Sequence, residues 1–117
     1  MKRTLAVSTL FLVLAAGCAD RSQTALKRVQ STPSALPGMS VEKAVLEVVQ
    51  DLRTMQQFGD GEGVWYSNRA YEYDDREIYR VGYSYRHGGR SSIFGWVYDY
   101  RSRKLTPITP LAEQVHP

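Results

Sequence analysis

The distribution of aromatic side chains limits the fold of this chain more than any other feature of its sequence. Twelve of its 13 Phe, Trp and Tyr residues lie between Phe58 and Tyr100, and aromatic side chains favour strands. Three turn signals divide this stretch: Asp74-Asp75, His87-Gly88-Gly89 and Arg101-Ser102-Arg103. We therefore expect an antiparallel meander whose strands are 64–73, 77–86, 91–100 and a short fourth strand at 104–108. Because proline has no N–H to donate, Pro107 ends the fourth strand or confines it to an edge.

The segment before the aromatic stretch predicts one amphipathic helix, from Ser40 to Phe58. Its apolar residues recur with the spacing of one helical face: Val41, Ala44, Val45, Val48, Val49, Leu52 and Met55. Ser40 is a suitable N-cap, and Gly59 suits the left-handed conformation at a helix end. Because its β-branched residues lower helix propensity, this helix must pack its apolar stripe on the sheet. The predicted fold class is α+β, with one amphipathic helix packed on a 3–4-stranded antiparallel β-meander in two layers.

The N-terminal residues have the pattern of a secretory signal. Lys2 and Arg3 precede an uncharged run, Leu5 to Ala16, which is shorter than the about 20 residues that a helix needs to cross a bilayer. The run ends in Leu14-Ala15-Ala16-Gly17-Cys18, which resembles the lipobox of bacterial lipoproteins. In that family the signal is removed just before a Cys that becomes the acylated N-terminus. The resemblance covers residues 1–18, and it departs from the family at Ala15, where Leu or Val is usual.

The lipobox resemblance implies a signal peptide at 1–17 and a lipid on Cys18. Because Ala19 follows the Cys where retention in the inner membrane would want Asp, family behaviour implies the periplasmic face of the outer membrane. Each buried CH₂ of an acyl chain contributes about 0.8 kcal/mol, so several chains make a permanent anchor. The alternative is ordinary secretion, which would leave Cys18, the only cysteine, as a free thiol.

Composition divides the rest of the chain into a tether, one small domain and a tail. The 100 residues that follow the signal are enough for a single domain. Residues 18–39 are polar and interrupted by Pro33, Pro37 and Gly38, so we expect the lipidated Cys and a flexible tether there. The α+β domain is expected at 40–110, and an irregular tail at 111–117.

Charge and motifs indicate no nucleic-acid partner, catalysis, cofactor or metal. The chain has 15 basic and 12 acidic residues, but Lys2 and Arg3 are lost with the signal. The 13 basic residues that remain nearly balance the 12 acidic ones, so the net charge does not indicate a nucleic-acid partner. Residues 59–63 contain two carboxylates, fewer than the about six to eight oxygens that Ca²⁺ needs. We expect the carboxylates near the 74–75 turn to be solvated instead of facing one another across a cleft. His87 and His116 lack the spacing of a zinc site, and the chain is not expected to be an enzyme.

Alternation along the strands predicts both the core and a binding surface. Successive side chains point to opposite faces, and we expect the row Tyr79, Val81, Tyr83 and Tyr85 in the core. The register stays open, because a slip of one residue exchanges the two faces. One helix covers only part of the sheet, and Tyr, Trp and Arg are enriched at interfaces. The expected partner-binding residues are Arg69, Tyr71, Arg80, Arg86, Trp96 and Tyr98. The alternative is a solvated sheet on which Arg stems stack over Tyr rings.

The order of lipobox, tether, helix and meander is similar to that of small outer-membrane lipoproteins of the BamE/SmpA type. Gly38-Met39-Ser40 before the helix and Trp65-Tyr66 at the start of the first strand lie where that family has comparable residues. The chain departs from the family in its single longer helix and in lacking a Gly-x-Pro motif.

The envelope location and the aromatic/Arg face favour a non-enzymatic lipoprotein. We expect an accessory subunit of an outer-membrane or trans-envelope protein complex, with no nucleic acid and no small-molecule substrate. The alternative is a lipid-tethered inhibitor or exclusion factor, of phage or plasmid type, that binds an incoming protein.

Overall fold

The computed structural model describes residues 20–73 and 76–117, without the side chains of Glu72 and Tyr73. The expected signal peptide, Cys18 and the expected 74–75 turn therefore lie outside the described residues. The elements in chain order are α2 (Ser22–Ser31), α3 (Val41–Thr54), β1 (Gly61–Tyr73), β2 (Arg76–His87), β3 (Arg90–Asp99), β4 (Leu105–Pro107) and α4 (Pro110–Val115).

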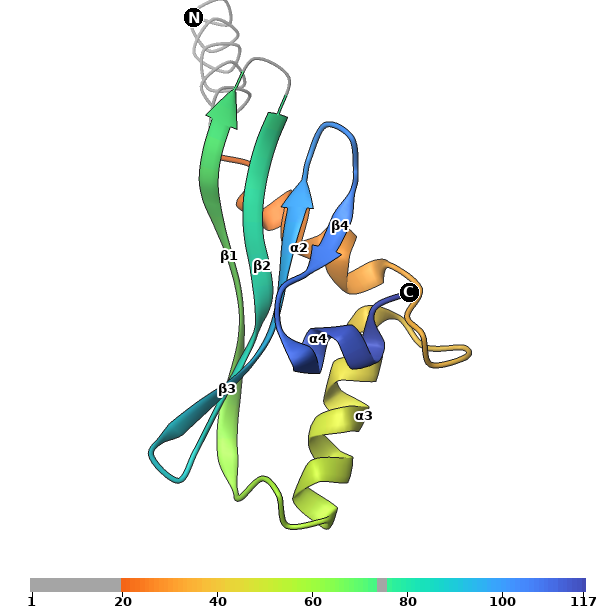
Figure 1. Ribbon diagram of the computed structural model, residues 1–117, viewed down its shortest axis with the longest axis vertical. Coiled ribbons are helices and arrows are strands. Elements are labelled where there is room, and N and C mark those ends of the chain that lie inside the picture. Colours follow the sequence, from red (N-terminus) through yellow and green to blue (C-terminus); the bar gives the residue numbers. More distant parts are fainter. Residues whose placement is uncertain (1–19, 74–75) are drawn as a thin grey trace, which may run out of the picture.

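The four strands form one antiparallel sheet in the order β1-β2-β3-β4, and the helices pack on one of its faces (Figure 1). This arrangement confirms the predicted α+β class, with an antiparallel meander and two layers. The β2–β3 connection is the predicted Gly turn. Gly88 and Gly89 have φ values of 53° and 74°, which a two-residue hairpin turn of type I′ requires at both positions.

The register decides which strand rows enter the core. Tyr83 lies opposite Trp65 on β1 and Phe94 on β3, and Val81 lies opposite Trp96. The predicted core row on β2 is confirmed, because all four of its side chains are buried against the helices: Tyr79, Val81, Tyr83 and Tyr85. The large aromatic rings of the sheet thus complement small helix residues, as the two-layer arrangement requires.

Helix α3 begins as predicted, with the Ser40 hydroxyl accepting a hydrogen bond from the Lys43 N–H. It ends at Thr54, earlier than the predicted Phe58. Gln56, with a φ of 60°, takes the left-handed conformation that we expected at Gly59. The chain therefore leaves the helix early, and the ring of Phe58 stacks on Tyr85 with their centroids 5.3 Å apart.

The prediction of a flexible tether at 18–39 is wrong for the described residues. Residues Ser22–Ser31 form α2, whose Ala25 and Val29 are fully buried in the core. The loop that follows is also ordered, because the Val41 N–H donates to the Thr32 carbonyl at 2.8 Å. The sequence signal for this helix is weak, because it consists of two small apolar residues four positions apart. The helix is stabilised by tertiary packing, since it buries these residues against the aromatic side chains of the sheet.

The prediction of an irregular tail at 111–117 is also wrong. Helix α4 begins at Pro110 and is capped by the Thr109 hydroxyl, which accepts from the Ala112 N–H. Ala112 and Val115 are fully buried. Proline is well tolerated in the first turn of a helix, so Pro110 starts this helix instead of preventing one.

Candidate protein-binding face

Within residues 20–73 and 76–117, no helix packs on the opposite side of the sheet, and we call this side the open face. Its side chains are defined by the register, in rows that cross the strands. One row joins Val64, Ser84 and Ile93. The next row joins Tyr66, Gly82 and Gly95, and the Ile108 N–H donates to the Gly95 carbonyl at 2.9 Å.

Tyr66 lies across the glycines at the centre of the open face. A Cβ atom added to Gly82 would come within 2.7 Å of the Tyr66 hydroxyl oxygen, and one added to Gly95 within 3.4 Å. Burial raises the pKa of Tyr66, and the nearby positive charge of Arg80 offsets part of that rise. The glycine pair therefore forms a shallow seat that the tyrosine ring fills, which gives the centre of the face a rigid floor.

Three aliphatic side chains around this floor are exposed to solvent. Val64 is 62% exposed, Ile93 40% and Ile108 53%. They come from β1, β3 and the segment after β4, but the sheet places them on the same side. A group of exposed aliphatic side chains on one side of a hydrogen-bonded sheet is typical of a binding site for another protein.

Two arginines of β2 lie on either side of this aliphatic cluster. Arg80 and Arg86 are exposed and six positions apart, which corresponds to roughly 20 Å along a strand. Neither makes an ion pair within residues 20–73 and 76–117, although Glu62 is opposite Arg86 in the register. Both guanidinium groups are thus available for a carboxylate on a partner.

The structure places three of the predicted partner-binding residues on the open face: Tyr71, Arg80 and Arg86. It contradicts the prediction for Trp96 and Tyr98, which are 0% and 5% exposed and belong to the core. Arg69 lies opposite Tyr79 in the register and is therefore on the helix side of the sheet. The error arose because strand alternation alone does not say which row faces inward.

Sequence reasoning missed the aliphatic residues and the glycine seat. Val64, Ile93 and Ile108 are ordinary strand residues, and their exposure depends on the absence of a cover. The signal that was available is the glycine pair. Gly82 and Gly95 interrupt two strands that are otherwise rich in large residues, and glycine inside a strand often marks close approach of another group.

The remaining candidate sites of the sequence have structural roles. Asp60, in the glycine-rich segment 59–63, pairs with Arg53 at 2.7 Å. The buried His87 ring lies 4.4 Å from the ring of Phe58, and its Nε2 atom is 3.0 Å from the Ser92 hydroxyl. In the described part of the chain, no group of three His, Cys, Asp or Glu side chains is placed to hold a metal ion.

Comparisons with known proteins give no relative. No family model matches the chain, and neither the curated proteins nor the solved structures include a significant match. Among the described residues, no helix combines the length and apolar character needed to cross a membrane. The structure therefore defines the class of the protein by fold alone, as an α+β protein of two layers with one open sheet face.

Proposed function

We propose that this chain is a non-enzymatic envelope lipoprotein that binds a protein of an outer-membrane or trans-envelope complex through its open face. One observation carries the proposal. The open face exposes Val64, Ile93 and Ile108 on one side of the sheet, between the guanidinium groups of Arg80 and Arg86, which make no ion pair within the described residues. The lipobox pattern that ends at Cys18 supports the envelope location.

The aliphatic cluster is suited to supply affinity. Burial of apolar surface contributes about 25 cal/mol per Å², and these three side chains retain much of their surface in the isolated chain. Val64 and Ile93 stand on paired strands around the Tyr66–Gly82 seat, and the Ile108 N–H donates to the Gly95 carbonyl, so their backbone is already ordered. A preformed surface loses little conformational entropy on association, which leaves more of the burial energy as affinity.

The two arginines define the chemistry of the partner. Charged groups at the rim of an interface speed association and select the register of the partner more than they add affinity. Arg80 and Arg86 therefore favour a surface with an apolar centre and carboxylates about 20 Å apart. A partner with basic groups at these places would be rejected, because two guanidinium charges would face like charges.

The proposal is tested by crosslinking and pull-down of the tagged full-length chain from detergent-solubilised envelopes. The test variant combines Arg80→Glu with Arg86→Glu. The matched control combines Lys27→Glu with Lys43→Glu, which makes the same charge change at exposed helix positions off the open face. We expect the same discrete partners with the wild type and the control, and their loss with the test variant.

A second pair of variants tests the apolar centre separately from the charges. Val64→Ser with Ile93→Ser removes exposed aliphatic surface from the open face, and Leu46→Ser with Met55→Ser removes it elsewhere. With the partner purified, we expect the first pair to weaken the Kd at least about tenfold and the second to leave it within about twofold. Retention of the partner by both open-face variants, with native circular dichroism, would contradict the proposal. If the pull-down recovers the lipidated chain without any partner, the proposal that it is a subunit of an envelope complex is wrong.

A further inference from the structure

Arg21, the residue immediately before α2, is held against the sheet by three contacts. Its backbone N–H donates to the Tyr79 hydroxyl at 3.0 Å. Its Nε atom lies 3.9 Å from a carboxylate oxygen of the buried Glu77. Its guanidinium carbon lies 4.9 Å from the centre of the Tyr100 ring. Both the backbone and the side chain of Arg21 are thus placed on the sheet.

Helix α2 is itself packed on the sheet, so it does not allow Arg21 to move away from the sheet. Ala25 and Val29 are fully buried in the core. On the same helix, the Arg28 guanidinium carbon lies 4.1 Å from the centre of the Tyr100 ring, and its Nη1 donates to the Tyr98 hydroxyl at 3.5 Å. From Arg21 onward, the N-terminal segment therefore moves with the sheet.

Only Ala19 and Asp20 separate Arg21 from Cys18. Three residue steps span at most about 11 Å when fully extended. The Asp20 side chain accepts a hydrogen bond of 2.9 Å from the Ser22 N–H, so this residue is also bound to the start of the helix. The expected flexible tether of about 20 residues would have allowed a much longer reach.

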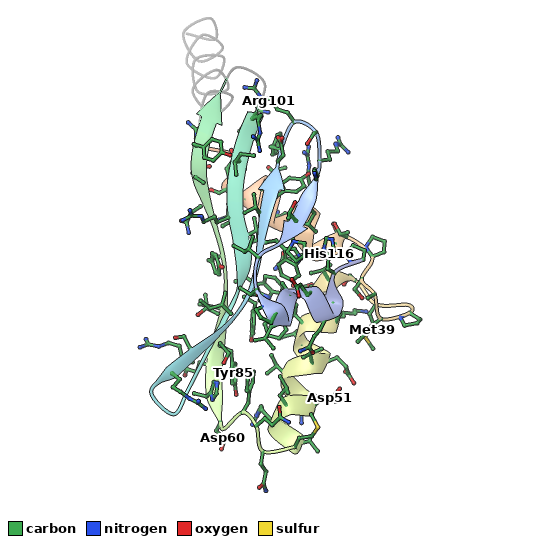
Figure 2. The ribbon with its side chains drawn as sticks, viewed as in Figure 1. Met39, Asp51, Asp60, Tyr85, Arg101 and His116 are labelled. Carbon is green, nitrogen blue, oxygen red and sulfur yellow. The ribbon has the colours of Figure 1, made fainter. Side chains whose placement is uncertain are left out.

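Arg21 lies at one end of the strands, which we call the anchored end. Its neighbours Glu77 and Tyr79 are near the start of β2, and the turn at 101–104 follows β3 at the same end. Figure 2 shows Arg101 at this end, with Tyr85 and Asp60 at the other. A 12-residue strand such as β2 is roughly 40 Å long, so the two ends are far apart.

We propose that the anchored end rests directly on the phospholipid headgroups, with the opposite end of the sheet held away from the bilayer. This inference depends on the lipid at Cys18 that the proposed function includes. All four residues of the 101–104 turn are exposed and polar, so this end contacts headgroups without entering the hydrocarbon. The binding face then reaches no farther than about 50 Å from the bilayer, and its partner is a membrane-embedded or membrane-adjacent protein.

The covalent anchor, and not charge, sets this orientation. Arg103 and Lys104 are exposed and make no ion pair within the described ranges. Asp20, next to Arg21, is exposed at the same end, and its carboxylate reduces any attraction to anionic lipid. We therefore expect the contact to persist at about 0.5 M NaCl, where surface electrostatic attraction is largely screened.

The experiment uses the full-length lipidated protein reconstituted in vesicles that contain a phospholipid with a nitroxide on its headgroup. Because Cys18 is the only native cysteine and carries the lipid, a new cysteine takes a fluorophore selectively. Lys104→Cys marks the anchored end, and Asp60→Cys marks the opposite end. We expect strong quenching at position 104 and little at position 60, with and without salt.

A second variant inserts a Gly/Ser segment of about 20 residues between Ala19 and Asp20. It keeps the Asp20–Ser22 contact and restores a long tether, so quenching at position 104 should fall while the circular dichroism stays native. Equal quenching at both positions, or no effect of the insertion, would overturn the inference. Absence of the protein from the membrane fraction, with Cys18 open to labelling, would instead contradict the lipid anchor of the proposed function.

Discussion

Arg21 and Tyr79 are 58 positions apart in the sequence, and the Arg21 N–H donates a hydrogen bond of 3.0 Å to the Tyr79 hydroxyl. The same hydroxyl donates a hydrogen bond to the carboxylate of Glu77. Glu77 is 2% exposed and lies between Arg21 and Arg101. Burial and the hydrogen bond to Glu77 raise the pKa of Tyr79, so the hydroxyl remains a donor at neutral pH. One phenol group therefore joins the start of α2 to a buried carboxylate of the sheet.

The first prediction concerns this hydroxyl. Tyr79→Phe should lower the free energy of unfolding by about 1–3 kcal/mol, because it removes one donor from a buried carboxylate and one acceptor from a backbone N–H. Urea unfolding at neutral pH measures the change. Tyr83→Phe is the matched control, because the Tyr83 hydroxyl has no hydrogen-bond partner within residues 20–73 and 76–117, and it should change stability little. Equal losses in the two variants would refute a special role for Tyr79.

The second prediction concerns α2 as part of the fold. Val29→Ala should lower the free energy of unfolding by about 2 kcal/mol, since it removes buried methyl groups and leaves a cavity. Gln23→Ala, at an exposed position of the same helix, should change it by less than about 0.5 kcal/mol. Chemical denaturation of both variants is the measurement. If residues 22–31 were a tether, neither substitution would affect stability.

The third prediction concerns the glycine seat. Gly82→Ala should destabilise the chain by about 1–3 kcal/mol, because the new methyl group would overlap the Phe94 carbonyl oxygen and press on the Tyr66 ring. Gly59→Ala is the control, since no described residue other than its chain neighbours lies within 4 Å of a Cβ built there and its φ is not positive. The control should leave the melting temperature unchanged or slightly higher. A melting temperature for Gly82→Ala equal to that of the wild type would show that the sheet relaxes freely at this point.

The fourth prediction is a dependence on acid. Burial opposes ionisation of Asp99, but hydrogen bonds from the Arg101 N–H and from Ser102 outweigh it, so the pKa of Asp99 is lowered. The unfolded chain, with an ordinary Asp pKa of about 4, binds its proton at higher pH than the folded chain. This contribution to stability is therefore complete above the unfolded pKa and is lost as the pH falls through the folded pKa.

Asp99→Asn tests that dependence. The variant removes the titrating group and its ion pair with Arg76, whose Nε lies 3.9 Å from the carboxylate. We expect the decrease in melting temperature below about pH 4 to become shallower than in the wild type. Melting curves from neutral to strongly acid pH, recorded by circular dichroism, provide the comparison. An unchanged acid slope would mean that other carboxylates account for the acid lability.

Local sequence signals were sufficient to predict the strands and the first residue of α3. The Gly88-Gly89 turn supplies the φ values that a tight hairpin needs, and Ser40 supplies a capping oxygen. These signals act between residues close in the chain, so they are readable without the rest of the molecule. The presence of Arg80 and Arg86 on one strand row likewise follows from alternation alone.

The tertiary structure decided which row faces inward and what covers it. Trp96 and Tyr98 alternate along β3 like any strand residues, and only the register with β2 and the helices on that side bury them. Ala25 and Val29 specify α2 only when the aromatic face of the sheet is present to pack against them. Burial is a property of the whole assembly of elements, because the free energy of removing an apolar side chain from water depends on neighbours that are distant in sequence. The same reason explains why the exposed aliphatic side chains of the open face are recognisable as a site only in the folded chain.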